Sequence, residues 1–168
     1  ALTAALFVTS IVLMQFVQQQ FFPSSDRPEL LVDLNLAQNS SLEETRQVVD
    51  RLEATLKDDP DISRWSTYIG EGAARFYLPL DQQLQNPFYA QLVIVSNDLE
   101  ARQQLAARLK KRLREDFVGI SSLVQPLEMG PPVGRPIQYR ISGPDIDKVR
   151  DYAMQVAGLL DGNPSIGD

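Results

Sequence analysis

The chain has 168 residues with 16 basic and 22 acidic side chains, a net charge of −6, and neither cysteine nor histidine. The two missing residue types exclude a disulfide framework, a thiolate or imidazole metal site and a Ser-His-Asp triad. The acidic balance is unfavourable for nucleic-acid binding, which needs clustered basic side chains.

The first 25 residues contain no charged side chain, so every charge lies in the body that follows. Thirteen of residues 1–17 are apolar, and their polar interruptions form no face wide enough for a surface helix. Seventeen helical residues extend about 26 Å, slightly less than the roughly 30 Å hydrocarbon core of a bilayer. Two phenylalanines then suit a membrane–water interface, and Pro23 ends the helix. We therefore interpret residues 1–22 as the end of a transmembrane helix.

Residues 1–25 allow two other interpretations. A signal peptide needs a basic segment and a small-x-small cleavage site, and residues 1–25 have neither. A buried core helix stays open as the alternative. Because the chain begins with alanine, we expect it to be cut from a longer protein.

The body is predicted to alternate strands with helices. Residues 30–36 form a strand-like run that places Asp33 and Asn35 on one face. Ser41 and Glu44 match a capping box and predict a helix that carries one apolar stripe, comprising Leu42, Thr45, Val49, Leu52 and Leu56. The further predicted elements are strands over 62–69, 89–95 and 120–127, an extended piece over 76–80, and a helix that starts near Asp98 and faces inward with Leu105, Leu109, Leu113 and Phe117.

This order predicts an α+β, ferredoxin-like fold over residues 29–128: an antiparallel sheet with both helices on one face. A linker with Gly130 and Gly134 follows, then a predicted strand over 137–142 and a helix that begins at Pro144. A shift of 104 residues superposes the apolar positions of this helix on those of the first. We therefore expect residues 136–168 to be the start of a second, truncated copy.

Aromatic and glycine residues surround the long connection between the strands predicted over 62–69 and 89–95. Loops of nearly twenty residues are often functional, and aromatic side chains beside glycines suit an adaptable apolar pocket. Ordinary packing under the loop is the alternative interpretation. The set comprises Trp65, Tyr68, Gly70, Gly72, Phe76, Tyr77, Phe88 and Tyr89.

No metal or cofactor site is predicted elsewhere. Asp58, Asp59 and Asp61 form an acidic turn, but a calcium loop needs about six oxygen ligands and a glycine bend, so we expect a solvated helix end. The basic run over 108–114 is expected on the outer face of its helix, with phosphate or lipid binding as the alternative.

The sequence resembles the resistance-nodulation-division (RND) efflux permeases, the AcrB-like inner-membrane pumps, in four features taken together. These are an apolar helix that leads into FFPSSDRPELLVDLNLAQNSSLEET, a D-P-D-I turn, a glycine-bearing aromatic loop, and a second unit that begins ISGPD. The resemblance covers essentially the whole chain. Its most specific parts are residues 22–45 and 134–145.

The resemblance implies one porter subdomain and the start of the next, placed in the periplasm after Pro23. It implies a proton-driven secondary transporter rather than an enzyme. The intact permease would be a homotrimer that works with a periplasmic adaptor and an outer-membrane channel. Its other partners would be membrane lipid and amphiphilic substrates. Residues 70–76 resemble the loop between the two drug pockets, although they hold fewer phenylalanines. The substrate-binding candidates are Gly70, Gly72, Phe76, Tyr77 and Phe88.

Other functions stay open at this point. The absence of histidine and cysteine, with three scattered methionines, disfavours heavy-metal export within the same family. A membrane-tethered ferredoxin-like binding module is the alternative to a transporter. Enzyme chemistry with a Ser-Lys pair or a carboxylate dyad ranks third, since the sequence positions no such pair.

Overall fold

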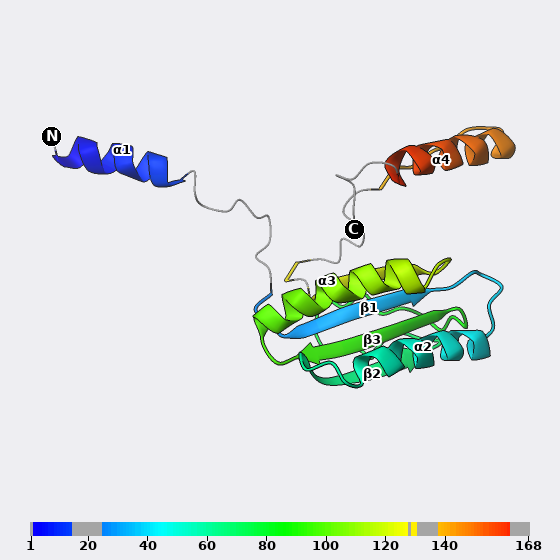
Figure 1. Cartoon of the computed structure of the whole chain (residues 1–168). Coiled ribbons are helices and arrows are strands. Elements are labelled where there is room, and N and C mark those ends of the chain that lie inside the picture. Colours follow the sequence, from blue (N-terminus) through cyan, green and yellow to red (C-terminus); the bar gives the residue numbers. More distant parts are fainter. Residues whose placement is uncertain (1, 15–24, 128, 131–137, 162–168) are drawn as a thin grey trace.

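The computed structural model describes residues 2–14, 25–127, 129–130 and 138–161, and Figure 1 shows its elements along the chain. The helices are α1 (Leu2–Met14), α2 (Leu42–Leu56), α3 (Leu99–Asp116) and α4 (Ile146–Asp161). The strands are β1 (Glu29–Asn35), β2 (Ile62–Ile69), β3 (Tyr89–Ser96) and β4 (Ser121–Pro126). The four strands predicted over 30–36, 62–69, 89–95 and 120–127 are therefore confirmed to within one residue at each end.

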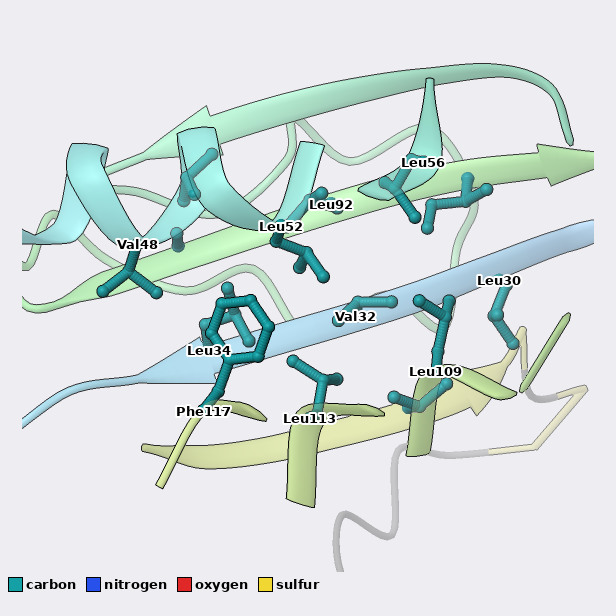
Figure 2. Close-up of a cluster of buried hydrophobic side chains, with 14 of the residues drawn as sticks. Leu30, Val32, Leu34, Val48, Leu52, Leu56, Leu92, Leu109, Leu113 and Phe117 are labelled. Carbon is teal, nitrogen blue, oxygen red and sulfur yellow. The ribbon is translucent and has the colours of Figure 1, made fainter. Parts of the chain in front are cut away.

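The four strands form one antiparallel sheet in the order β2-β3-β1-β4. On β1, Asp33 lies opposite Gln91 of β3 on one side and opposite Leu123 of β4 on the other. Both α2 and α3 pack on the same face of the sheet (Figures 1 and 2). The strand order and the one-sided helices confirm the predicted ferredoxin-like α+β fold.

The main core fills the space between the two helices and the sheet. Side chains alternate along a strand, so every second residue of β1 and β3 faces the helices. Figure 2 shows these side chains meeting the inward stripes of α2 and α3, which confirms the predicted inward leucines of α3. Leu42 differs from the prediction, because at the first turn of α2 it is 44% exposed. The largest fully buried side chains of this core are Leu30, Val32, Leu34, Val49, Leu52, Leu56, Leu92, Ile94, Leu105, Leu109 and Leu113.

Both predicted helix starts are confirmed. Ser41 Oγ accepts a hydrogen bond from the Glu44 amide at 3.2 Å, and the Glu44 carboxylate accepts one from the Ser41 amide at 2.7 Å. Asp98 caps α3 by accepting from the Ala101 amide at 2.8 Å. These local bonds satisfy amides that have no partner within the helix, and so fix where each helix begins.

Two predicted strand-like segments are wrong. The segment 76–80 is a bend and turn, in which the Leu80 amide donates to the Tyr77 carbonyl at 3.3 Å, because Leu80 turns inward to be buried. Residues 138–142 do not form a strand, and none of the described strands pairs with them. The physical reason is that an isolated strand leaves its backbone groups without hydrogen-bond partners. Ile137 itself lies outside the described residues.

The segments predicted at the two ends of the chain lie partly outside the described residues. The helix expected over residues 1–22 is described as α1, and residues 15–22 with Pro23 lie outside the described residues. Among the described residues, none of the helices combines the length and the apolar character needed to cross a bilayer. The expected helix after Pro144 is confirmed as α4.

Candidate functional site

The connection between β2 and β3, residues 70–88, lies across the face of the sheet that the helices leave open. Ala73 and Leu80 of this loop are buried against Leu31 of β1 and Leu127, which follows β4. Tyr68, Tyr77 and Val93 pack around them. The loop therefore has a small core of its own, separate from the helix-side core.

Glycine permits the sharp turn at which the loop leaves β2. Gly70 has a φ of +80°, a left-handed conformation that a side chain disfavours. Its amide donates to the Tyr89 carbonyl at 2.8 Å, and its carbonyl accepts from the Asn86 amide at 2.7 Å. At Gly72, a Cβ atom would lie 3.0 Å from the backbone nitrogen of Gln83. The two glycines thus allow the loop to fold back closely on itself.

A buried glutamine fastens the loop to the sheet. Gln91 of β3 is 3% exposed, and its side-chain oxygen accepts a hydrogen bond from the Ala73 amide at 2.8 Å. Its Nε2 donates to Oδ1 of Asp33 at 2.7 Å. The Tyr89 hydroxyl donates to the same oxygen at 2.5 Å. Asp33, Tyr89 and Gln91, here called the Asp33 cluster, therefore link β1, β3 and the loop.

The Asp33 carboxylate is held by neutral donors rather than by a cation. Burial raises the pKa of Asp33, the two hydrogen bonds oppose this effect, and the negative charge of Asp81 adds to it. Burial and the nearby Asp33 charge raise the pKa of the Tyr89 hydroxyl, which therefore stays protonated and acts as a donor. In the part of the chain that the structure describes, no basic side chain forms an ion pair with Asp33.

Beside this cluster lies a hollow of about 180 Å³. It is lined by Asp33, Asn35, Gln83, Tyr89 and residues 121–123. Every fully buried side-chain nitrogen or oxygen of the described residues has a hydrogen-bond partner, and the bonds to Asp33 all end on Oδ1. Its second oxygen, Oδ2, is therefore not fully buried, and Asp33 is one of the side chains that line the hollow.

The structure distributes the five predicted binding residues along the loop. Gly70 and Gly72 form its first turn, and Phe88 immediately precedes β3, where its carbonyl accepts from the Leu36 amide at 2.9 Å. Phe76 and Tyr77 contact each other, with ring centroids 5.4 Å apart, and Phe76 is 42% exposed. None of the five lines the hollow at Asp33.

The wider aromatic set is divided between the two faces of the sheet. Trp65 packs against the helix-side core and donates its indole N–H to Glu53 at 3.1 Å, whereas Tyr68 packs under the loop. Only the part of the set on the open face can contribute to a site there.

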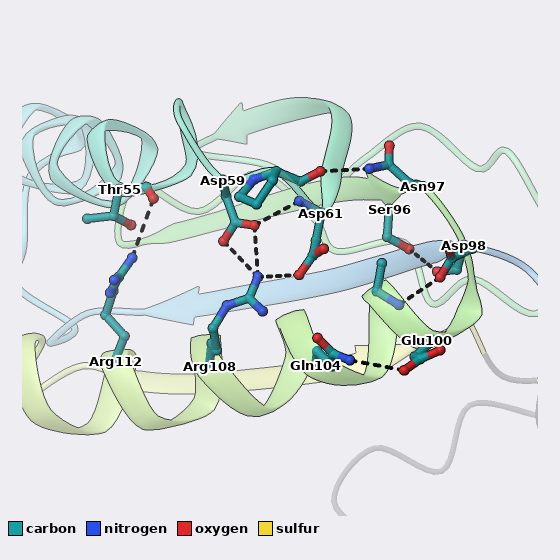
Figure 3. Close-up of polar contacts among 12 residues, drawn as sticks. Thr55, Asp59, Asp61, Ser96, Asn97, Asp98, Glu100, Gln104, Arg108 and Arg112 are labelled. Carbon is teal, nitrogen blue, oxygen red and sulfur yellow. Dashed lines mark hydrogen bonds and ion pairs between the residues drawn. The ribbon is translucent and has the colours of Figure 1, made fainter.

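The acidic turn after α2 is bound within the fold. Arg108 of α3 lies 2.8 Å from the carboxylates of both Asp59 and Asp61, and Figure 3 shows its side chain between them. Arg112 donates to the Thr55 carbonyl at 3.4 Å. These contacts join α3 to the end of α2, so the expected solvated helix end is in part paired within the fold, with the Asp59 and Asp61 side chains 14% and 26% exposed. Among the described residues, no group of three acidic, histidine or cysteine side chains could hold a metal ion.

Sequence reasoning did not identify the Asp33 cluster as a site. The available signal was a carboxylate at position 33 within the apolar run LLVDLNL. A charged side chain in a strand that pairs on both sides requires partners, which here come from β3.

The chain belongs to the AcrB/AcrD/AcrF family, whose family model matches residues 1–168. This membership confirms the resemblance to RND efflux permeases. No curated protein matches the chain.

Among solved structures, the chain is similar to a heavy metal efflux pump in two crystal forms. The TM-scores are 0.61 and 0.60, at 19% and 18% sequence identity, and each match covers 97% of this chain. At such identities the likeness establishes the fold. The chain spans 18% of the length of each pump chain.

Proposed function

We propose that the chain is part of a proton-driven RND efflux permease, in which it supplies a periplasmic porter subdomain and part of the pathway for amphiphilic compounds. Family membership over the whole chain and the shared fold support this proposal. Within it, residues 1–22 are the end of a transmembrane helix, 29–128 are the porter subdomain, and 136–168 begin a second one.

The proposal places the protein in a bacterial inner membrane, with the residues after Pro23 in the periplasm. The intact permease would be a homotrimer that works with a periplasmic adaptor and an outer-membrane channel. Transport would be conformational, because substrate moves outward as porter subdomains rock against each other.

One observation carries the proposed role in binding: the face of the sheet away from the helices bears an anchored loop with one exposed aromatic side chain. Phe76, which is 42% exposed and contacts the half-buried Tyr77, gives this loop an apolar contact surface, and Gly70 and Gly72 let it fold back closely. Phe88, which is half-buried, lies at the far end of the loop. We assign these five residues to substrate contact or to the shape of the loop.

The proposed substrates are amphiphilic organic compounds rather than metal ions. The described residues hold no group of metal ligands, and the chain has neither histidine nor cysteine. The similar pump's description as a heavy metal efflux pump concerns that protein, with which this chain shares 19% identity.

The proposal is tested in the intact permease, expressed in cells that lack their own efflux pumps. The wild type should lower the accumulation of an amphiphilic dye, and Phe76→Ala should raise it again at unchanged expression. Val118→Ala, an exposed position on the connection between α3 and β4, is the matched control and should behave as wild type. A wild-type permease that exports no amphiphile contradicts the proposed function.

The membrane assignment has its own test. In liposome flotation, the 168-residue chain should rise with the vesicles, and a version that lacks residues 1–22 should stay at the bottom of the gradient. A full chain that stays at the bottom contradicts the assignment.

A further inference from the structure

The hollow at Asp33 has a polar lining. Of its lining side chains, Asp33 alone carries a charge, and the others are amides, hydroxyls and one leucine. Amides and hydroxyls both donate and accept hydrogen bonds, so they select neither sign of charge, whereas the carboxylate is an acceptor only. The charge of Asp33 therefore makes the hollow favour a positively charged ligand group that donates hydrogen bonds.

The Asp33 carboxylate is arranged to receive such a group. Tyr89 and Gln91 both donate to Oδ1, which fixes the carboxylate in place and leaves Oδ2 without a hydrogen bond from either of them, in a side chain that lines the hollow. The negative charge of Asp81, in the loop, adds to the rise in the pKa of Asp33 and so makes the potential there more negative. A partly buried carboxylate without a cation is costly, and a charge-assisted hydrogen bond from an ammonium group would offset this cost.

Other ligand classes fit the hollow less well. An anion would be repelled by Asp33 and Asp81. A divalent cation such as calcium prefers about six oxygen ligands with several carboxylates, whereas this hollow supplies one carboxylate. A volume of about 180 Å³ holds a small polar head group, so the apolar part of an amphiphile would lie outside it.

We propose that this hollow is a subsite for the protonated amino group of an amphiphilic ligand, with Oδ2 of Asp33 as its acceptor. The inference rests on the proposed function, since it names the class of compound that the pathway would admit. Leu123, which lies opposite Asp33 on β4, supplies apolar contact for the first carbons of the ligand.

The test is an NMR titration of the isotope-labelled 168-residue chain with hexylamine, and with hexanol as the neutral probe. Burial raises the pKa of Asp33, so the titration is done at about pH 8, which favours the ionised carboxylate and keeps the amine protonated. Hexylamine should shift the amide signals of residues 33, 35, 83, 89 and 121–123, and hexanol should shift them much less.

Asp33→Asn keeps one acceptor oxygen for Tyr89 and Gln91, and it replaces Oδ2 by an NH2 donor, so it removes both the charge and the acceptor proposed for the ligand. It should weaken hexylamine binding by roughly tenfold or more, the value of one charge-assisted hydrogen bond. Asp50→Asn, an exposed carboxylate on helix α2, should bind like wild type. Equal shifts by both probes, shifts elsewhere in the chain, or unchanged binding by a folded Asp33→Asn protein would each overturn the proposal.

Export by the intact permease separates this inference from the proposed function. The substrates are a fluorescent amphiphile with a primary amine and its N-acetylated, neutral form. If Asp33→Asn impairs export of the amine alone, the subsite is supported. If the wild type exports both compounds and Asp33→Asn affects them equally, the subsite is wrong while the efflux function stands. If the wild type exports neither, the efflux function itself fails, and the NMR titration still decides the subsite.

Discussion

Tyr89 on β3 donates its hydroxyl to Oδ1 of Asp33 on β1 at 2.5 Å, on the face of the sheet away from the helices. Gln91 donates to the same oxygen, so two neutral donors hold one carboxylate. Burial is the main reason that the pKa of Asp33 is raised. The fold therefore needs an acceptor at position 33, whereas the negative charge there is unfavourable for stability.

Substitutions at position 33 separate these two effects. We expect Asp33→Asn to be at least as stable as wild type at neutral pH, because it keeps the acceptor oxygen and removes a desolvated charge. Asp33→Ala should lose about 1–3 kcal/mol of unfolding free energy, because it leaves the Tyr89 and Gln91 donors without a partner. Urea unfolding followed by fluorescence of Trp65, the single tryptophan, measures both. Equal losses in the two variants would contradict this account.

The raised pKa of Asp33 also predicts a dependence of stability on pH. The folded state binds this proton more tightly than the unfolded state, so wild type gains stability relative to Asp33→Asn as pH falls through the raised pKa. The gain is complete below the unfolded value of about 3.9. The difference between the two proteins removes the contribution that other carboxylates make to the pH dependence of stability. One of these is Glu29, whose pKa is lowered by Arg27. A difference in unfolding free energy that stays constant between about pH 4 and pH 8 would exclude the effect.

Removing the Gln91 side-chain amide should release the loop locally. Gln91→Met has a similar size but cannot accept from the Ala73 amide, so we expect that amide to exchange with solvent faster. The Gly70 amide, which donates to a backbone carbonyl, should stay protected. Gln125→Met on β4 is the matched control and should leave the exchange of Ala73 unchanged. Slow exchange of Ala73 in Gln91→Met would show that another contact holds the loop.

Two glycines with positive φ test what the turn at the start of the loop requires. Gly70 has a φ of +80°, and Gly119, between α3 and β4, has a φ of +85° with open space around it. Alanine at either position should cost about 1–2 kcal/mol for the left-handed backbone. A Cβ at Gly70 would meet Leu42 at 2.7 Å, but this leucine is half-exposed and can rotate away. Similar losses of unfolding free energy are therefore expected, and a much larger loss at Gly70 would show that Leu42 cannot move.

The fold was largely predictable because its signals are local. The capping residues Ser41 and Asp98 lie within three residues of the amides that they cap, so a short motif reveals them. The inward stripe of α3 follows from helical spacing alone. Alternation along β1 likewise shows which of its residues face the helices, and the order of the elements then indicates the sheet.

The candidate site depends on contacts between residues far apart in the sequence. Tyr89 is 56 residues from Asp33, and Gln91 is 58 residues from it, so no spacing rule connects them. The same limit explains the two wrong segments. Burial of Leu80 under the loop, rather than local propensity, makes 76–80 a turn, and the strand predicted over 137–142 depends on a pairing partner.

A buried arginine fastens the segment that leads into β1. Arg102 of α3 is 7% exposed, and its Nη1 donates to the carbonyls of Ser25 at 2.7 Å and Arg27 at 2.6 Å. Arg102→Met keeps much of the apolar stem and removes both bonds. We expect a loss of about 2–3 kcal/mol, since hydrogen bonds from a charged donor are among the stronger ones and the two carbonyls lose their partner.

Arg108→Met on the same helix is the control for this prediction. The Arg108 side chain is 46% exposed where it bridges Asp59 and Asp61, and ion pairs in contact with solvent contribute about 1 kcal/mol or less. Urea unfolding at matched pH and salt measures both variants, and added salt should reduce the loss at Arg108 more than the loss at Arg102. If Arg108→Met proves the more destabilising, the account is wrong. The ion pair between α3 and the acidic turn would then stabilise the fold more than the hydrogen bonds of the buried Arg102 guanidinium do.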